Sequence, residues 1–221
     1  MVNKPDKRTA VVFGATGLVG SRLVMHLKDH YLYSTVRSFN RKPVDGKYLN
    51  VENHEIDFDR LEEYAHLIKG DDLFICLGTT IKKAGSVKKM EEIDRDLPVK
   101  IARIACENGI RRIAVVSSLG ANPSSGNFYQ RIKGEMEQGI REIPFDRIVI
   151  ARPSILLGKR KEFRFGELVG RLVIRVIGFL FAGPLRKYRG IEAGRVATAL
   201  VVLLRAQGDQ VVYESHELAK T

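Results

Sequence analysis

The sequence predicts an α/β protein of the doubly wound class, in which helices cover both faces of a parallel sheet. Short apolar segments rich in β-branched residues alternate with longer segments whose apolar residues recur every three or four positions. Strands this apolar need helices on both faces of the sheet. A glycine-rich turn also joins the first strand to the first helix, as it does in sheets of this class.

The predicted elements alternate along the chain. The β-branched run that ends at Gly14 predicts the first strand, and helical spacing follows over residues 18–30. Pro98 is expected to bend the helix that begins near Ile93 and that Gly109 ends. The same patterns predict strands at 10–14, 34–37, 54–58, 73–77, 112–117 and 145–151, and further helices at 61–68 and 128–140.

Length and composition favour one compact domain. The chain has 221 residues and a formal net charge of +11, and α/β units of this size commonly fold as a single domain. We therefore expect one domain over residues 1–221, with residues 159–206 as a small helical region for substrate or partner contacts. Cys76 and Cys106 form no C-x-x-C pair, so we expect no disulfide framework and a cytoplasmic location. No apolar run is long enough for a membrane span.

The glycine-rich turn has the spacing G-x-x-G-x-x-G over residues 14–20. A βαβ unit holds the pyrophosphate of a dinucleotide at this junction. Glycine is needed there because a Cβ would block the turn and keep backbone N–H groups from the phosphates. The alternative is a purely structural turn. We predict a cofactor loop formed by Gly14, Thr16, Gly17, Leu18, Val19 and Gly20.

The choice between the two nicotinamide cofactors is read near the end of the second strand. An acid there favours NAD, and a cation favours the 2′-phosphate of NADP. Arg37 stands about 20 residues beyond the glycine turn, followed by Arg41 and Lys42, whereas the nearest downstream acid is Asp45. An Arg guanidinium suits a phosphate. We predict that NADP(H) is preferred over NAD(H), the alternative being that Arg37 is a solvated surface residue.

A serine, a tyrosine and a lysine follow in an order that suits carbonyl chemistry. The predicted strand 112–117 runs into Ser117 and Ser118, and the next helix carries Tyr129 and Lys133 on one face. The Lys133 ammonium would favour a Tyr129 phenolate that exchanges a proton with a substrate oxygen, and Lys133 would also bind the nicotinamide ribose. A serine hydroxyl would steady the substrate oxygen. Ser118 is the candidate and Ser117 the fallback, because adjacent strand residues point to opposite faces. A surface tyrosine beside a solvated lysine is the alternative.

These motifs resemble the short-chain dehydrogenase/reductase superfamily in its atypical NAD(P)-binding branch, over nearly the whole chain. They are similar to the Tat-interacting, metastasis-suppressor-like oxidoreductases and their bacterial relatives. The resemblance is carried by residues 14–20, Asp57-Phe58, residues 117–121 and 127–135, and residues 145–147 through Arg152-Pro153 and Gly158.

The resemblance implies a Rossmann-like fold and a set of site residues. Ser118, Tyr129 and Lys133 would form the catalytic triad. Asp57, with Phe58 beside it, would approach the adenine amino group, while Leu77, Gly78 and Thr79 would line the cofactor. One departure is the sequence Leu77-Gly78-Thr79-Thr80 where many members carry Asn-Ala-Gly, which removes a proton relay through that asparagine.

Other features have simpler explanations. His26 and His30 share a helix face, but no third ligand follows, so no metal site is predicted. The lysines at 82–83 and 88–89 are either solvated or steer an anionic ligand. The basic segment 159–189 carries an apolar stripe that either packs in the core or contacts a membrane surface or an acidic protein; its residues are Leu168, Leu172, Val176 and Phe179. No motif for specific nucleic-acid binding is present.

Two functions remain open from the sequence. The first is an NADP(H)-dependent oxidoreductase that acts on a small carbonyl or alcohol. The second is an NADP(H)-binding regulator or interaction protein with little or no turnover. The substrate is not predicted, because the residues that would select it lie in the C-terminal part of the chain.

Overall fold

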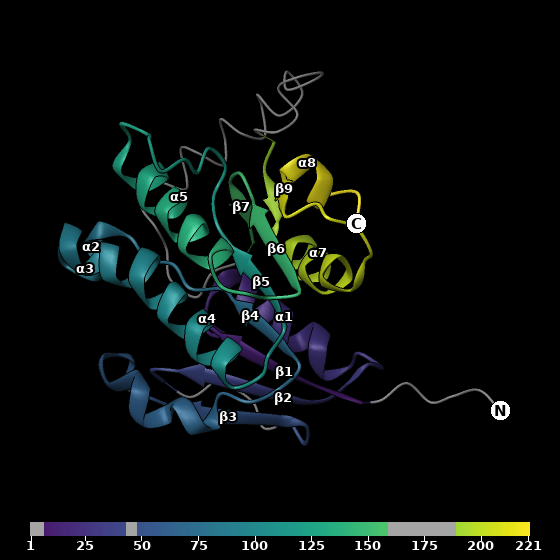
Figure 1. Cartoon of the computed structure of the whole chain (residues 1–221). Helices are drawn as coiled ribbons and strands as arrows, with labels where there is room; N and C mark the ends of the chain where they lie inside the picture. The colour runs from purple at the N-terminus through teal and green to yellow at the C-terminus, as the bar shows by residue number, and fades with distance from the viewer. Residues whose placement is uncertain (1–6, 43–47, 159–188) are drawn as a thin grey trace.

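A seven-stranded parallel sheet forms the centre of the computed structural model, which describes residues 7–42, 48–158 and 189–221 (Figure 1). The strand order is β3-β2-β1-β4-β5-β6-β9. The direction of winding reverses between β1 and β4, and doubly wound sheets bind ligands at that point, beyond the carboxyl ends of the strands. The strands are β1 (Arg8–Phe13), β2 (Tyr33–Asn40), β3 (Val51–Glu55), β4 (Asp72–Ile75), β5 (Arg112–Val116), β6 (Arg147–Arg152) and β9 (Val212–Glu214).

Helices cover both faces of this sheet, as the sequence predicts (Figure 1). One face carries α1 (Leu18–Lys28), α7 (Ala193–Arg205) and α8 (Ser215–Leu218). The other carries α4 (Leu97–Glu107), α5 (Phe128–Arg141) and the 3-10 segment η1 (Phe58–Leu67). Two short helices, α2 (Ile81–Ala84) and α3 (Val87–Glu91), follow β4, and β7 (Leu156–Leu157) pairs with β8 (Ile191–Glu192).

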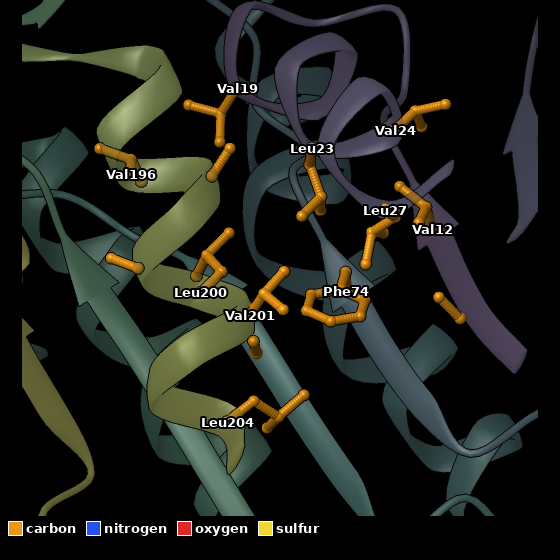
Figure 2. Packing of buried hydrophobic residues seen from close by; sticks show 14 of the residues in the cluster. Val12, Val19, Leu23, Val24, Leu27, Phe74, Val196, Leu200, Val201 and Leu204 are labelled. Atoms are coloured by element: carbon orange, nitrogen blue, oxygen red, sulfur yellow. The ribbon is translucent and has the colours of Figure 1, made fainter. Parts of the chain in front are cut away.

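Strand β1 shows why both faces are covered. Ala10 and Val12 belong to the hydrophobic cluster beneath α1 and α7, whereas Val11 and Phe13 belong to the cluster beneath α4 and α5. All four are fully buried. Successive strand residues point to opposite faces, so a strand apolar at every position needs two helical layers. Figure 2 shows the first cluster, in which α1 and α7 pack together over Val12 and Phe74.

The structure confirms the predicted class and refines its elements. The second strand continues to Asn40 because Phe39 and Asn40 pair with His54 and Glu55 of β3. The short helices α2 and α3 were not predicted. Of the region 159–206, residues 159–188 lie outside the described residues, including the predicted basic helical stripe. The described remainder contains α7, whose Leu200 is fully buried in the core of the sheet.

The helix predicted from Ile93 begins as a π-helical turn, η2 (Glu92–Asp96), which leads directly into α4. Pro98 lies in the first turn of α4 and has no N–H to donate to the Asp94 carbonyl. The Leu97 N–H instead bonds to the Glu92 carbonyl, five residues back. A widened turn thus stands directly before the proline, and in it Asp94 is fully buried while Ile93 is only partly buried.

Candidate cofactor and catalytic site

The glycine turn has a backbone conformation and close contacts that a Cβ would prevent at two of its three glycines. Gly14 has φ of 84°, and a Cβ there would lie 2.7 Å from the Cys76 carbonyl oxygen. A Cβ at Gly20 would lie 2.1 Å from the Gly14 carbonyl oxygen. Gly17 differs, because its φ of −77° suits any residue and its Cβ would meet that oxygen at 3.2 Å. Gly14 and Gly20 are therefore required by the fold itself, whereas a side chain at Gly17 would need the Gly14 carbonyl to shift by only a few tenths of an ångström.

The N-terminus of α1 fits an anionic ligand. Its N-cap residue is Gly17, no side chain caps the helix, and its first turn carries no acidic residue. The first N–H groups of a helix have no partners within the helix and carry a partial positive charge. Together with the close packing of Gly14 against β4, this arrangement suits the pyrophosphate of a dinucleotide.

Arg37 does not lie where the sequence count places it. It occupies the middle of β2, three residues before the strand ends at Asn40. Its Nε donates to Glu52 Oε2 at 2.8 Å, and its Nη1 donates to the Lys69 carbonyl at 3.1 Å. Three strand residues span about 10 Å, so this guanidinium is remote from the carboxyl edge of the sheet. The spacing count misplaces Arg37 because β2 is longer than predicted.

Arg41 lies at the correct end of β2. It follows Asn40 directly, and it borders an open cavity of about 360 Å³ together with Asp57 and Tyr64. Asp57 caps η1 by accepting the Asp59 N–H at 3.0 Å, and Phe58 contacts Phe13 at a centroid distance of 6.2 Å. The structure thus brings Arg41 and Asp57 together at the end of the sheet where the adenosine of a dinucleotide would bind.

The loop after β4 continues the same edge. Leu77 is half-buried, Gly78 is exposed, and the Thr79 N–H donates to Asp94 Oδ2 at 2.9 Å. Thr80 begins α2 and Ser86 begins α3, each as an N-cap whose hydroxyl accepts a backbone N–H. Of the lysines that follow, Lys89 is bound to Asp59 and Glu92.

Tyr129 and Lys133 share one face of α5, which Asn127 caps by accepting the Gln130 N–H at 3.1 Å. Tyr129 is 37% exposed, whereas the Lys133 side chain is only 2% exposed. The Lys133 Nζ lies 2.7 Å from Asp94 Oδ1. Burial alone would lower the pKa of Lys133, but the charges of Asp94, Tyr129 and Glu137 raise it above its usual value. Lys133 is therefore a buried ammonium, not a solvated one.

The two serines after β5 have different environments. Ser117 is 5% exposed, and its hydroxyl donates to Glu137 Oε1 at 2.5 Å. Arg152 holds the same carboxylate, with its Nε 2.9 Å from Oε1. This buried network ties β5 and β6 to α5. Ser118 lies outside it and is half-buried, with its carbonyl bonded to the Ala121 N–H.

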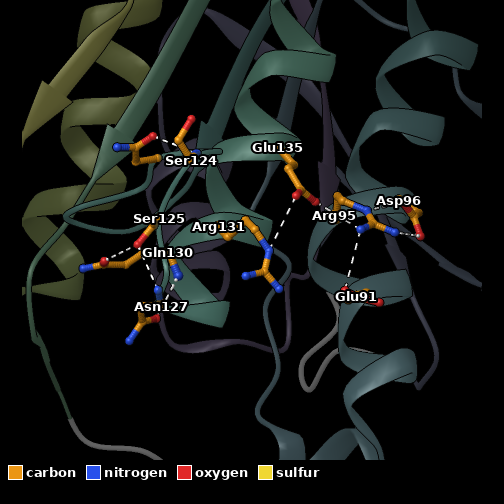
Figure 3. Close-up of polar contacts among 10 residues, drawn as sticks. Glu91, Arg95, Asp96, Ser124, Ser125, Asn127, Gln130, Arg131 and Glu135 are labelled. Atoms are coloured by element: carbon orange, nitrogen blue, oxygen red, sulfur yellow. Dashed lines mark hydrogen bonds and ion pairs between the residues drawn. The ribbon is translucent and has the colours of Figure 1, made fainter.

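The loop that follows Ser118 is held against α5. A Cβ at Gly134 would lie 2.2 Å from the Pro123 nitrogen, so the loop backbone contacts the helix directly. The Asn122 N–H donates to the Gln130 carbonyl. The Ser125 hydroxyl donates to Gln130 Oε1 at 3.0 Å (Figure 3). The position of this loop relative to Tyr129 is therefore defined by short-range packing. The sequence patterns do not identify Gly134 or Asp94 as part of the site. A signal for Asp94 is present, because it lies three and seven residues before the buried Leu97 and Ile101, a spacing that places it on the same helix face.

Neither a metal cluster nor a membrane span is found in the part of the chain that the structure describes. No group of three or more His, Cys, Asp or Glu side chains there is arranged to hold a metal ion. His26 and His30 contact each other edge to face, with ring centroids 5.3 Å apart. None of the helices within residues 7–42, 48–158 and 189–221 has the length and apolar character to cross a bilayer.

Comparison with known proteins identifies the family of this chain. A family model described as NAD(P)H-binding matches residues 14–160. The chain belongs to this NAD(P)H-binding family, and its fold is that of the atypical short-chain dehydrogenase/reductases. The particular relatives include Protein HTATIP2 of Rattus norvegicus, 36% identical over 76% of this chain and 71% of that protein. Another is Protein FMP52, mitochondrial, of Debaryomyces hansenii, 34% identical over 94% of this chain and 93% of that protein.

Solved structures show the same fold. MoeE5 in complex with UDP-glucose and NAD has a TM-score of 0.69 at 15% identity, covering 96% of this chain and 80% of that one. The ADP-L-glycero-D-manno-heptose-6-epimerase of Helicobacter pylori also has a TM-score of 0.69, at 18% identity, covering 100% of this chain and 82% of that one. At these identities the likeness concerns the fold alone.

The relatives overturn one expectation from the sequence. The cytoplasmic location expected from the cysteine content is wrong, because the FMP52 proteins of several fungi are named as mitochondrial. Few cysteines without a disulfide indicate a reducing environment, and that property does not distinguish the cytoplasm from other reducing compartments.

Proposed function

We propose that this protein is an NADP(H)-dependent oxidoreductase that acts on a small carbonyl or alcohol. The observation that carries the proposal is the pair on α5, in which an accessible Tyr129 phenol lies one turn from the buried Lys133 ammonium. The pair follows the loop from Ser118, at the carboxyl edge of the sheet. The alternative, a surface tyrosine beside a solvated lysine, does not fit, because the Lys133 side chain is only 2% exposed.

The glycine turn and the ends of the neighbouring strands would hold the cofactor. Gly14, Thr16, Gly17, Leu18, Val19 and Gly20 would hold the pyrophosphate, Asp57 and Phe58 the adenine, and Leu77, Gly78 and Thr79 the nicotinamide half. The bound cofactor supplies hydride. Arg41 would bind the 2′-phosphate from the cavity at the end of β2, which the acids Glu55 and Asp57 also line. The Arg37 side chain is already bonded to Glu52 and to the Lys69 carbonyl. The preference for NADP(H) over NAD(H) therefore rests on Arg41.

Three side chains would have separate roles in the proton transfer to and from the substrate oxygen. Tyr129 donates a proton to the carbonyl oxygen during reduction, or accepts one from the alcohol during oxidation. Lys133 would favour the charged form of the phenol. For the contact with the nicotinamide ribose that the sequence predicts, its 2% exposed ammonium would have to become accessible when the cofactor binds. Ser118 donates a hydrogen bond to the substrate oxygen. Ser117 is the weaker candidate for that role, because its hydroxyl is bonded to Glu137.

The deciding experiment measures binding and turnover together. Calorimetry gives the affinities of native protein for NADPH and NADH, and a panel of small aldehydes and ketones is screened for NADPH oxidation. Turnover that Tyr129→Phe removes would support the oxidoreductase. Tight NADPH binding without reduction of any carbonyl would instead support an NADP(H)-binding regulator or interaction protein.

A further inference from the structure

Among the residues that the structure describes, the buried ammonium of Lys133 has one close carboxylate partner, Asp94. Lys133 Nζ and Asp94 Oδ1 are 2.7 Å apart, and the two side chains are 2% and 0% exposed. Burying either charge without the other is strongly unfavourable, because neither would recover its lost hydration. The protonation state of the Lys133 side chain therefore depends on Asp94.

Asp94 also contacts the loop after β4. Its second oxygen, Oδ2, accepts the Thr79 N–H at 2.9 Å. A Cβ at Gly78 would lie 3.6 Å from Asp94 Oδ1, so this loop passes directly over the carboxylate. One side chain thus joins the loop proposed to line the nicotinamide half of the cofactor to the lysine proposed to contact its ribose.

The π-helical turn η2 explains how Asp94 reaches this position. Pro98 prevents a regular helical bond at the Asp94 carbonyl, and the widened turn directs residue 94 into the interior. Arg95, the next residue, holds the turn against α5 from outside, with its Nη1 3.0 Å from Glu135 Oε2 (Figure 3). Turns of this kind occur frequently at functional sites.

We propose that Asp94 is a positioning residue that keeps the Lys133 ammonium charged and fixed between the Thr79 loop and Tyr129. Within the described part of the chain, the charged and titratable groups that act on Lys133 are Asp94 from η2, and Tyr129 and Glu137 from α5. Glu137 is already paired with Arg152 of β6, which leaves Asp94 as the carboxylate that offsets the lysine charge. The effect of Asp94 on the cofactor rests on the proposed function, whereas its effect on Lys133 does not.

The proposal predicts that the charge of Lys133 depends on pH in a variant without the Asp94 carboxylate, over a range in which it stays constant in the native protein. With Asp94 present, the pKa of Lys133 is raised, so the ammonium persists well above neutral pH. Asp94→Asn retains the shape and the acceptor for the Thr79 N–H, but it removes the charge and turns its NH2 group, a donor, toward the Lys133 ammonium. Burial then dominates and lowers the pKa of Lys133, so the proton is lost as the pH rises through that lower value.

The first measurement is NADPH affinity by calorimetry between about pH 7 and about pH 9.5, a range below the ordinary lysine pKa. The native affinity is expected to vary by less than about threefold, and that of Asp94→Asn to fall by about tenfold or more, as a buried unpaired lysine requires. Asp72→Asn is the matched control. Asp72 is also fully buried and binds Arg112 and Tyr33, each at 2.6 Å, but it lies at the opposite edge of the sheet. That variant is expected to lose stability without a new pH dependence of affinity.

The second measurement follows Lys133 directly, by NMR of protein with ¹³C-labelled lysine. In native protein its Cε signal should show no deprotonation up to about pH 10, and in Asp94→Asn it should titrate at lower pH. Identical titrations in the two proteins, or a native Lys133 that titrates well below pH 10, would overturn the proposal. If the variant does not fold, a native Lys133 that titrates well below pH 10 still overturns the proposal. If native protein binds no NADPH, the proposed function fails while the titration still tests Asp94.

Discussion

At the scale of single residues, the site separates side chains that support the fold from side chains that remain accessible. Ser117, Glu137 and Arg152 form a buried network in which each polar group has a partner. Ser118 and Tyr129 lie outside that network and are partly exposed. A buried polar group that is already paired loses its bond when it engages a substrate, whereas an accessible hydroxyl does not.

Tyr129→Phe tests the proposed proton donor. The substitution keeps the ring and removes the hydroxyl, so NADPH affinity should stay within about threefold of native while turnover falls by about a hundredfold to ten-thousandfold. Steady-state kinetics on a verified substrate and calorimetry measure the two effects. Ser117→Ala is a useful comparison, since it should reduce stability more than turnover. Full activity in Tyr129→Phe would exclude the assigned role.

Arg41→Ala tests cofactor preference, with Arg37→Ala as its control. The first should weaken NADPH binding by about tenfold to a hundredfold and leave NADH unchanged, because bonds to a charged phosphate are worth about 1.5–3 kcal/mol. The second removes a partly exposed ion pair with Glu52 and should change neither affinity. Calorimetric titration of both variants with both cofactors is the measurement. Equal affinities of native protein for NADPH and NADH would contradict the proposed preference.

At the scale of elements, the three glycines at the junction between β1 and α1 have different structural and functional roles. Gly14 needs a positive φ, and Gly20 needs space against the Gly14 carbonyl. Gly17 needs no positive φ, since its backbone is extended, and a Cβ there would approach the Gly14 carbonyl oxygen to 3.2 Å, a contact that a small shift relieves. The same sequence motif thus contains residues required by the turn and a residue whose small size chiefly keeps the helix N-terminus accessible to a ligand.

Gly17→Val and Gly20→Ala should separate these tasks. Gly17→Val is expected to fold with a loss of about 1 kcal/mol or less, as for an altered N-cap, but to lose cofactor binding because its side chain would occupy space needed by the pyrophosphate. Gly20→Ala should destabilise the fold by about 1–3 kcal/mol or more, because its Cβ would overlap the Gly14 carbonyl. Chemical denaturation and calorimetry distinguish the outcomes. Unchanged NADPH affinity in Gly17→Val would show that the turn serves only the structure.

At the scale of the whole molecule, the C-terminal part of the chain completes the core. Helix α7 packs on α1 and on the sheet, and its buried face is continuous with the cluster around Val12 and Phe74 (Figure 2). The strand β9 extends the sheet beyond β6. The described residues after 188 therefore belong to the dinucleotide-binding unit itself.

Leu200→Ala tests this assignment. Leu200 is fully buried, so the substitution should reduce the free energy of unfolding by about 2–5 kcal/mol. Val202→Ala, on the exposed side of the same helix, should change it by less than about 0.5 kcal/mol. Urea denaturation measures both. Similar small losses in the two variants would mean that α7 is peripheral to the fold.

The sequence by itself determined the features that depend on local spacing. Alternating strand and helix patterns predict a parallel sheet with two helical layers, because periodicity reports which faces of each element are buried. The glycine spacing identifies the first turn, and the four-residue spacing of Tyr129 and Lys133 places them on one face of α5. Each of these inferences concerns residues within one element or one junction.

Only the tertiary structure decided which distant groups meet. Pairing with β3 carries β2 on to Asn40, which separates Arg37 from the cofactor edge and brings Arg41 to it. The burial of Lys133 against Asp94 depends on the packing of η2 on α5, and the bond from Ser117 to Glu137 depends on the packing of β5 on α5. These contacts join residues far apart in the chain, so no periodicity or spacing rule encodes them, and their energies arise from burial that exists only in the folded molecule.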